Sequence, residues 1–358
     1  MYYKYLLSFI FIIYSNIFEY NSLPIKIMNN KNKYIDTNLL EKYYEYAMIS
    51  YCNPDNIYNL NLGHTKTELY LKNNIIQNQI YYNNITNNLL WFFETEYSYF
   101  IIYRGTEMNS IENWQRNIKI IQEPYNTILM NCSNCYIHNG FNEMYSSVTN
   151  DFLYSFLPLK HKKPINIIGH SLGGALSTIL YLELQLYQSF YSTQYDIYLY
   201  TYGSPRVGNK DFSDLLYNYK NNSYRIVNNR DPIPHLPPAM TKYHLYQHIH
   251  NEIWIVDKEF CELDEKQSDL FNCKVIPTYI FCDIENYNDN FSESYSYQSE
   301  NYNDNFHFHS YQSKYNNKNQ ENKNCSYSLY KALNIYDHMN YFNKKKEFEY
   351  MFNVCLYS

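Results

Sequence analysis

The chain has 358 residues, of which 45% are hydrophobic and 18% are charged, and its formal net charge at pH 7 is -6. This composition supplies enough apolar side chains for one large domain or two ordinary ones, and it excludes global disorder. The basic run at residues 344–346 is too short to indicate a nucleic-acid-binding protein. The 46 tyrosines accompany abundant asparagine, so we attribute both to an AT-rich coding sequence and draw no functional prediction from them.

Residues 1–22 have the pattern of a targeting segment. Lys4 precedes an apolar run from Leu6 to Ile13, which has the length of a signal-peptide core and is short for a membrane span. We therefore expect entry into the secretory pathway, with cleavage between Ser15 and Ser22, and a protein that is secreted or kept in a lumen or vacuole. The alternative is an uncleaved N-terminal membrane anchor.

The remainder, residues 23–358, predicts a single domain in which strands alternate with helices. Asp36 is placed to cap a first helix that ends near Ile49. A long buried helix is expected over residues 172–187, and strands over residues 97–103, 165–168, 197–202 and 223–227. This alternation is typical of βαβ units and predicts an α/β fold with a mostly parallel sheet.

A polar insertion at residues 283–324 breaks this pattern. The segment at residues 285–291 recurs at residues 300–306. Two polar copies indicate a low-complexity duplication rather than a repeat architecture. We expect a disordered surface loop here.

The eight cysteines fit an oxidising compartment. Cys132 and Cys135 have the spacing of half a zinc site. Because a second pair of cysteines or histidines at metal spacing is missing, we favour a short disulfide loop. We predict no metal and no organic cofactor.

Seven of the eight glycines fall in four short segments, and one of these has the pattern Gly-x-Ser-x-Gly. It spans Gly169–Gly173, follows a predicted strand and opens the predicted helix, which is the context of a nucleophile elbow. Ser171 is then the predicted nucleophile. The backbone N–H of Leu172, at the helix N-terminus, would face a developing oxyanion. The alternative is a tight turn without chemistry.

A serine nucleophile on this fold takes an acidic residue and then a histidine, in that chain order. Asp231 follows a predicted strand and precedes a proline, which is a common address for a catalytic residue; its alternative is a simple turn residue. His307 and His309 belong to the duplicated loop, and His235 is too close to Asp231 in sequence. The remaining candidates are His244, His248, His250 and His338. Chain order favours His338 over the cluster at residues 244–250.

An amphipathic segment lies before the elbow in the sequence. Ile111, Trp114, Ile118 and Ile121 recur at helical spacing. This pattern predicts an amphipathic helix. The family resemblance given in the next paragraph implies that this helix is a lid, a movable element that covers Ser171 in water and lays its apolar face on lipid. An ordinary surface helix with its apolar face in the core is the alternative.

Taken in order, these motifs resemble the class 3 lipases, the family typified by the secreted fungal triacylglycerol lipases. The similarity covers roughly residues 47–355, interrupted by the polar insertion. The segments that carry it are residues 102–106 (IYRGT), 110–114 (SIENW), 138–141 (HNGF), 169–174 (GHSLGG), 202–209 (YGSPRVGN), 224–238 and 337–342 (DHMNYF). The link at residues 107–109 is slightly longer than in the fungal enzymes.

The resemblance implies an α/β-hydrolase fold, with a mostly parallel central sheet flanked by helices and a short lid helix. It also implies a Ser171, Asp231, His338 triad. Thr106 joins Leu172 in the oxyanion hole. Two disulfides follow from the resemblance, Cys132–Cys135 and Cys52–Cys355. Three pairings stay open for the other four cysteines, Cys261, Cys273, Cys282 and Cys325.

The activity that the resemblance implies is hydrolysis of carboxylic esters of lipids, as in a triacylglycerol lipase. The substrate would be reached at a membrane or droplet interface, with no nucleic-acid partner. Phospholipase, lysophospholipase and diacylglycerol lipase activities of the same family are alternatives. A non-catalytic lipid-binding protein that kept the fold is the rival from a different functional class.

Overall fold

The computed structural model describes residues 26–28, 34–63, 65–107, 120–127, 129–130, 132–157, 163–192, 195–239, 245–263, 271–282, 335–344, 351 and 355. From residue 257 to residue 282 it describes the backbone only. The predicted targeting segment and the whole polar insertion lie outside these residues. So do the lid candidates Ile111, Trp114 and Ile118.

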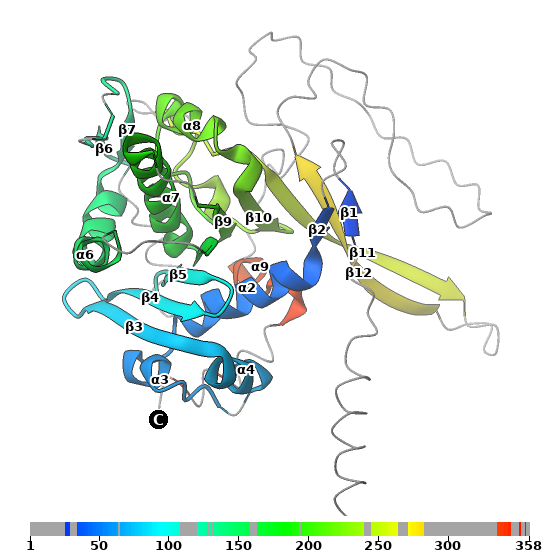
Figure 1. The fold of residues 1–358 in the computed structure, drawn as a ribbon. Coiled ribbons are helices and arrows are strands. Elements are labelled where there is room, and N and C mark those ends of the chain that lie inside the picture. The colour runs from blue at the N-terminus through cyan, green and yellow to red at the C-terminus, as the bar shows by residue number, and fades with distance from the viewer. Residues whose placement is uncertain are drawn as a thin grey trace, which may run out of the picture.

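The core of the molecule is an eight-stranded sheet with the order β12-β11-β10-β9-β8-β5-β4-β3 (Figure 1). Its strands are β3 (Ile75–Asn83), β4 (Asn88–Thr95), β5 (Tyr99–Tyr103), β8 (Ile165–His170), β9 (Ile197–Tyr202), β10 (Ser223–Asn228), β11 (Glu252–Leu263) and β12 (Phe271–Cys282). The run from β5 to β11 is parallel, and antiparallel strands extend the sheet at both ends. The predicted α/β fold with a mostly parallel central sheet is confirmed.

Helices cover this sheet, and two small antiparallel pairs lie outside it. The helices are α2 (Thr37–Ile49), α3 (Pro54–Tyr58), α4 (Lys66–Asn74), α6 (Asn139–Phe156), α7 (Leu172–Tyr191), α8 (Lys210–Tyr217) and α9 (Ile335–Met339), with 3-10 turns η2 (Lys220–Asn222), η3 (Ile233–His235) and η6 (Tyr341–Asn343). The small pairs are β1 (Lys26–Met28) with β2 (Tyr34–Asp36), and β6 (Gln122–Pro124) with β7 (Tyr136–His138). No helix of the described residues is long and apolar enough to cross a membrane.

Side-chain caps determine where several helices begin. The Asp36 carboxylate accepts the Asn38 N–H at 3.0 Å, so α2 starts where the sequence predicts. His138 Nδ1 accepts the Phe141 N–H at 3.2 Å at the start of α6. Such caps satisfy N–H groups that have no acceptor within the helix. His138, part of one family-like motif, therefore serves as a helix cap.

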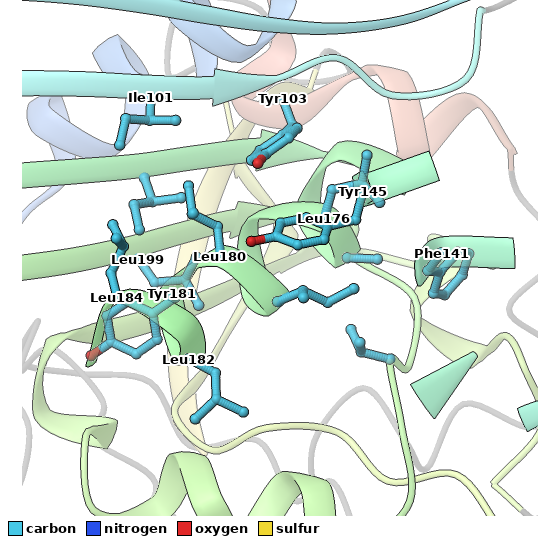
Figure 2. Packing of buried hydrophobic residues seen from close by; sticks show 14 of the residues in the cluster. Ile101, Tyr103, Phe141, Tyr145, Leu176, Leu180, Tyr181, Leu182, Leu184 and Leu199 are labelled. Atoms are coloured by element: carbon cyan, nitrogen blue, oxygen red, sulfur yellow. The ribbon is translucent and has the colours of Figure 1, made fainter. Parts of the chain in front are cut away.

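The two faces of the sheet carry separate apolar cores. Ile102 and Ile168 pack in the cluster that contains α2, whereas their neighbours Ile101 and Ile167 pack in the cluster built around α6 and α7 (Figure 2). This division follows because successive side chains of a strand point to opposite faces. The sheet is thus buried on both faces, as expected of a parallel sheet.

Tyrosine takes many of the large core positions. Tyr202 Oη donates to the Leu40 carbonyl oxygen at 2.6 Å, and Tyr181 Oη donates to the Tyr219 carbonyl oxygen at 2.7 Å. Both rings are fully buried. Buried tyrosine is favourable when its hydroxyl finds a partner. The abundance of tyrosine is therefore built into the core, whatever its coding origin.

Two disulfides are present among the described residues. Cys52–Cys355 joins positions 303 residues apart, whereas Cys132–Cys135 joins positions three residues apart. In the hairpin of β11 and β12 the backbone register places position 261 opposite position 273. The long bridge ties the segment after α2 to the C-terminal part of the chain.

The long bridge should contribute most to stability. Replacing Cys52 and Cys355 together by serine should lower the free energy of unfolding by about 2–5 kcal/mol, because the bond restrains a very long loop in the unfolded chain. The matched control replaces Cys132 and Cys135, whose short loop predicts a smaller loss. Urea denaturation of both double variants measures this difference. A larger loss from the short loop would contradict the prediction.

Candidate active site

Ser171 lies between β8 and α7 in an unusual backbone conformation. Its φ is 57° and its ψ is -129°, a combination rare for residues other than glycine. The Ser171 N–H donates to the Tyr202 carbonyl oxygen of the neighbouring strand at 2.9 Å. A strained turn from strand to helix is the geometry of a nucleophile elbow, which the Gly-x-Ser-x-Gly pattern predicted.

Close packing explains one flanking glycine of this turn. A Cβ atom on Gly173 would lie 2.1 Å from the Tyr103 carbonyl oxygen at the end of β5. No side chain fits in this space because the helix start approaches the strand backbone directly. The elbow is therefore held against β5, the strand that leads to Thr106.

Asp231 is fully buried beyond the end of β10 and collects several donors. Its Oδ1 accepts the Ile233 N–H at 2.9 Å, and its Oδ2 accepts the Tyr341 hydroxyl at 2.7 Å. Burial, reinforced by the nearby Asp231 charge, raises the pKa of Tyr341 well above its ordinary value. The phenol therefore stays protonated and donates to the carboxylate.

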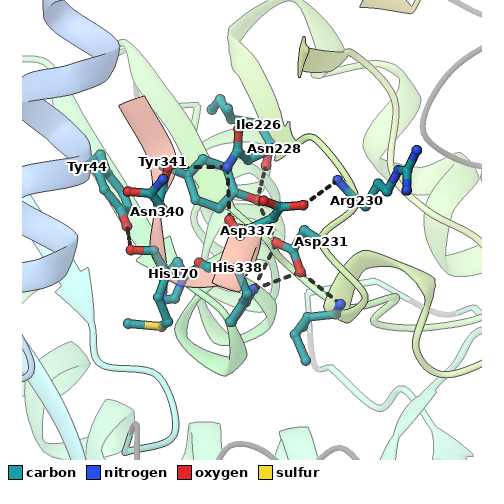
Figure 3. A network of polar contacts seen from close by, with 12 residues as sticks. Tyr44, His170, Ile226, Asn228, Arg230, Asp231, Asp337, His338, Asn340 and Tyr341 are labelled. Atoms are coloured by element: carbon teal, nitrogen blue, oxygen red, sulfur yellow. Dashed lines mark hydrogen bonds and ion pairs between the residues drawn. The ribbon is translucent and has the colours of Figure 1, made fainter. Parts of the chain in front are cut away.

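His338 completes a pair with this carboxylate. Its Nδ1 lies 2.9 Å from Asp231 Oδ1 and 2.8 Å from Oδ2, and its side chain is fully buried (Figure 3). A carboxylate only accepts, so Nδ1 carries the proton in the neutral ring. The other nitrogen, Nε2, is then the basic one.

Backbone contacts hold the segment of His338 in place (Figure 3). Asn228 Nδ2 donates to the Asp337 carbonyl oxygen at 2.9 Å, and the Arg230 N–H donates to Asp337 Oδ2 at 3.1 Å. From the other side, Tyr44 Oη donates to the Met339 carbonyl oxygen at 3.1 Å. The end of β10 and helix α2 thus fix α9 between them.

Three polar atoms at this site are buried without a hydrogen-bond partner among the described residues. They are Ser171 Oγ, His338 Nε2 and Thr106 Oγ1. Leu172 is the first residue of α7, so its N–H also has no acceptor within the helix. An unpaired buried polar group costs about 1–3 kcal/mol. Such groups are retained where a function uses them, and hydrogen bonds of a catalytic site often form only with substrate bound.

The structure distinguishes among the histidine candidates. Asp231 is bonded to His338, whereas His248 Nε2 lies 2.6 Å from the Pro234 carbonyl oxygen and His250 packs edge-on against the Tyr217 ring. His244 lies outside the described residues. Within the described part of the chain, no group of three or more histidine, cysteine, aspartate or glutamate residues is arranged to hold a metal ion.

Comparison with known proteins agrees with this geometry. Residues 100–241 match the family model described as Lipase (class 3). Over this stretch, which is less than half of its length, the chain is similar to the class 3 lipases. The matched residues include Ser171 and Asp231, and His338 lies beyond them.

Curated relatives of this chain include fungal lipases. A lipase of Rhizomucor miehei is 30% identical over 200 residues, which are 54% of this chain and 52% of the relative. Secreted mono- and diacylglycerol lipase 1 of Fusarium solani is 29% identical over 167 residues, which are 45% of this chain and 46% of the relative. The chain thus spans about half the length of the curated relatives it matches.

Solved structures extend the likeness over more of the chain. The Rhizomucor miehei triacylglyceride lipase has a TM-score of 0.57 at 22% identity, covering 86% of this chain and 94% of that one. Lipase II from Rhizopus niveus has the same TM-score at 20% identity, with the same coverage. At these identities the likeness establishes the fold, and the predicted α/β-hydrolase architecture is confirmed.

Sequence patterns missed one residue of this site. Tyr341 donates to Asp231 and lies in the family-like segment 337–342, but that segment predicted no role for it. The available signal is its position three residues after His338, which is about one helical turn. An aromatic residue at that spacing is usually core, so the hydroxyl contact becomes visible only in the folded chain.

Buried His248 should make stability depend on pH. Burial, followed by the charges of Arg225 and Arg206, lowers its pKa well below 6.5. Below about pH 6.5 the unfolded chain therefore binds a proton that the folded chain does not, and stability falls as the pH falls from about 6.5 towards the folded pKa. The slope from one such group is at most about 1.4 kcal/mol per pH unit.

His248→Gln should flatten this dependence, because glutamine keeps a polar side chain but does not titrate. Thermal unfolding of both proteins at pH 7.5, 6.5 and 5.5 measures the change in slope. The carboxylates and other histidines contribute equally to both proteins and cancel in the comparison. Identical slopes would mean that His248 is not neutral in the folded protein.

Proposed function

We propose that this protein hydrolyses carboxylic esters of lipids by nucleophilic catalysis. The observations that carry the proposal are the buried Asp231–His338 pair and the elbow conformation of the buried Ser171. In this scheme Ser171 Oγ attacks the ester carbonyl carbon while His338 Nε2 takes its proton. That proton then goes to the departing alcohol, and water releases the acyl group in a second, equivalent step.

The other site residues have supporting roles in this proposal. Asp231 keeps His338 in the required tautomer and stabilises its charged form. The backbone N–H groups of Thr106 and Leu172 bind the oxyanion of the tetrahedral intermediate. A solved triacylglycerol lipase of the same fold, described as having a serine protease triad as its catalytic centre, supports the assignment.

We propose acylglycerols as the substrate class. Support comes from relatives described as lipases and as secreted mono- and diacylglycerol lipases, in Fusarium solani and Malassezia globosa among others. Phospholipids and lysophospholipids are the alternatives within the family. The same relatives, together with the two disulfides, support a protein that enters the secretory pathway.

We also propose that residues 23–358 form one domain, with the polar insertion as a loop of it. The Cys52–Cys355 bridge and the contact of Tyr44 with Met339 support this, because both tie early residues to late ones. A single domain brings His338 to Asp231 without an interface between domains.

A lid is the last part of the proposal. Ser171 is fully buried, so an ester reaches it only after covering atoms have moved. We assign this cover to residues 111–121, on the helical spacing of Ile111, Trp114 and Ile118 in the sequence. In this proposal their apolar side chains are hidden over Ser171 in water and become exposed only when a lipid surface can cover them.

The first test is Ser171→Ala. The variant should lose more than about 99.9% of the activity on a p-nitrophenyl ester, since removing the nucleophile of a triad removes most of the rate. A fluorophosphonate probe should label the parent and fail to label the variant. A parent that neither turns over ester nor takes the probe would support the rival, a lipid-binding protein without catalysis.

The second test concerns the lid. The hydrolysis rate should rise steeply once a short-chain triglyceride exceeds its solubility limit, because a lipid surface then stabilises the open form. Trp114→Ser should flatten this rise and largely spare hydrolysis of a soluble ester, since serine removes the apolar area of the side chain. Equal losses on both substrates would show that Trp114 belongs to the core or supports the catalytic geometry.

A further inference from the structure

A chain of hydrogen bonds runs behind the proposed nucleophile. Tyr51 follows α2, and its Oη lies 2.7 Å from His170 Nδ1. On the other side of the ring, His170 Nε2 lies 2.8 Å from the carbonyl oxygen of His338. The Tyr51 and His170 side chains are buried. His170 directly precedes Ser171 in the sequence, but both of its ring nitrogens are engaged by Tyr51 and by the His338 backbone.

The partners determine the direction of each bond. A carbonyl oxygen only accepts, so His170 Nε2 must carry a proton. Burial, followed by repulsion from His338, lowers the pKa of His170 well below its ordinary value, so the ring is neutral and Nδ1 accepts. Tyr51 Oη therefore donates to Nδ1. Its oxygen in turn accepts a hydrogen bond from the Gly105 N–H.

The hydrogen bonds of this chain all run in one direction. Gly105 donates to Tyr51, Tyr51 donates to His170, and His170 donates to the His338 carbonyl oxygen. Hydrogen bonds arranged in this manner polarise and strengthen one another. A second proton on His170 would make both ring nitrogens donors and oppose the Tyr51 hydroxyl. The arrangement thus has one favourable set of proton positions.

The two ends of this hydrogen-bond chain lie at different parts of the proposed active site. Gly105 precedes Thr106, and a Cβ on Gly105 would lie only 2.1 Å from Tyr51 Oη and 3.1 Å from Ser171 Cβ. At the other end, the rings of His170 and His338 lie 4.4 Å apart. The hydrogen-bond chain therefore runs from the loop at Gly105 and Thr106, here called the oxyanion loop, to the proposed base His338. On its way it passes behind the proposed nucleophile Ser171.

Tyr51 is itself held firmly. The next residue, Cys52, is bonded to Cys355, and the Asn53 N–H donates to the Cys355 carbonyl oxygen at 3.1 Å. The Tyr51 ring also packs edge-on against His170. The phenol is thus fixed by a covalent bridge on one side and by the site on the other.

We propose that Tyr51 and His170 are positioning residues, which set the distance between the oxyanion loop at Thr106 and the base His338 through this directed chain. The inference rests on the ester hydrolysis proposed above. Neither residue touches the reacting atoms in this assignment. Misplacing a catalytic group by about 1 Å can cost about a hundredfold in rate, so such a chain has a large effect on turnover and little on substrate binding.

The test begins with Tyr51→Phe, which keeps the ring and removes the hydroxyl. We expect kcat on a soluble p-nitrophenyl ester to fall at least about tenfold while KM stays within about twofold. The matched control is Tyr181→Phe, which likewise removes the hydroxyl of a buried tyrosine, in this case one that donates to the Tyr219 carbonyl oxygen. This control should leave kcat within about twofold. A kcat of Tyr51→Phe no lower than that of the control would overturn the proposal.

Replacement of His170 separates positioning from packing. Glutamine can accept from Tyr51 and donate to the His338 carbonyl, whereas leucine can do neither. We expect His170→Gln to retain at least about fivefold more kcat than His170→Leu. If His170→Leu does not fold, the single variant His170→Gln is compared with the double variant His170→Gln, Tyr51→Phe. The double variant should have the lower kcat, because without the Tyr51 hydroxyl the glutamine has no donor to accept from. If the two compared variants have equal kcat, the proposed hydrogen-bond chain through His170 is wrong.

A double-variant cycle completes the test. If Tyr51 and His170 act through one chain, the combined Tyr51→Phe and His170→Leu variant should lose no more kcat than the worse single variant. Losses that multiply would refute the shared chain. This failure differs from failure of the proposed function, in which the parent itself neither turns over ester nor takes the fluorophosphonate probe.

Discussion

The Asp231 carboxylate holds together two segments that are 107 residues apart in the sequence. A buried carboxylate is costly unless donors surround it, and here the donors come from its own turn, from His338 and from Tyr341. Because the charge needs these donors, the segment of α9 has one favourable position at the end of β10. Loss of any one donor would leave the charge partly unpaired, so the pair and its surroundings form one unit rather than a sum of contacts.

Tyrosine hydroxyls connect this unit to the rest of the molecule. Tyr44 reaches it from α2, Tyr341 from η6, and Tyr51 contacts the neighbouring His170. Burial is the main cause that raises the pKa of each of these phenols, so they remain donors. A phenol combines a large apolar ring with one directed hydrogen bond. A core rich in tyrosine can therefore pack like an apolar core and still orient polar groups over long sequence distances.

Two kinds of structure position the groups of the proposed active site. β5, β8, β9 and β10 are central and parallel, and their carboxyl ends bring Thr106, Ser171 and Asp231 to one edge. Ligand and catalytic sites of such sheets lie at this edge because each strand ends there in a loop. His338 instead arrives from a short helix near the end of the chain. The sheet thus positions three of the proposed groups, and long-range hydrogen bonds position the fourth.

The elbow could be predicted from the sequence because it is local: a strand, two glycines around a serine and a helix lie within about twenty-five residues. Asp231 was predictable for a related reason, since a strand followed by proline marks the edge of the sheet. Chain order favoured His338, but order carries no distance, so only the fold separated it from His248 and His250. The roles proposed for Tyr341, Tyr51 and His170 depend on contacts between residues 110, 119 and 168 positions apart. Such contacts depend on how separate elements pack, and no local pattern of residue types contains that information.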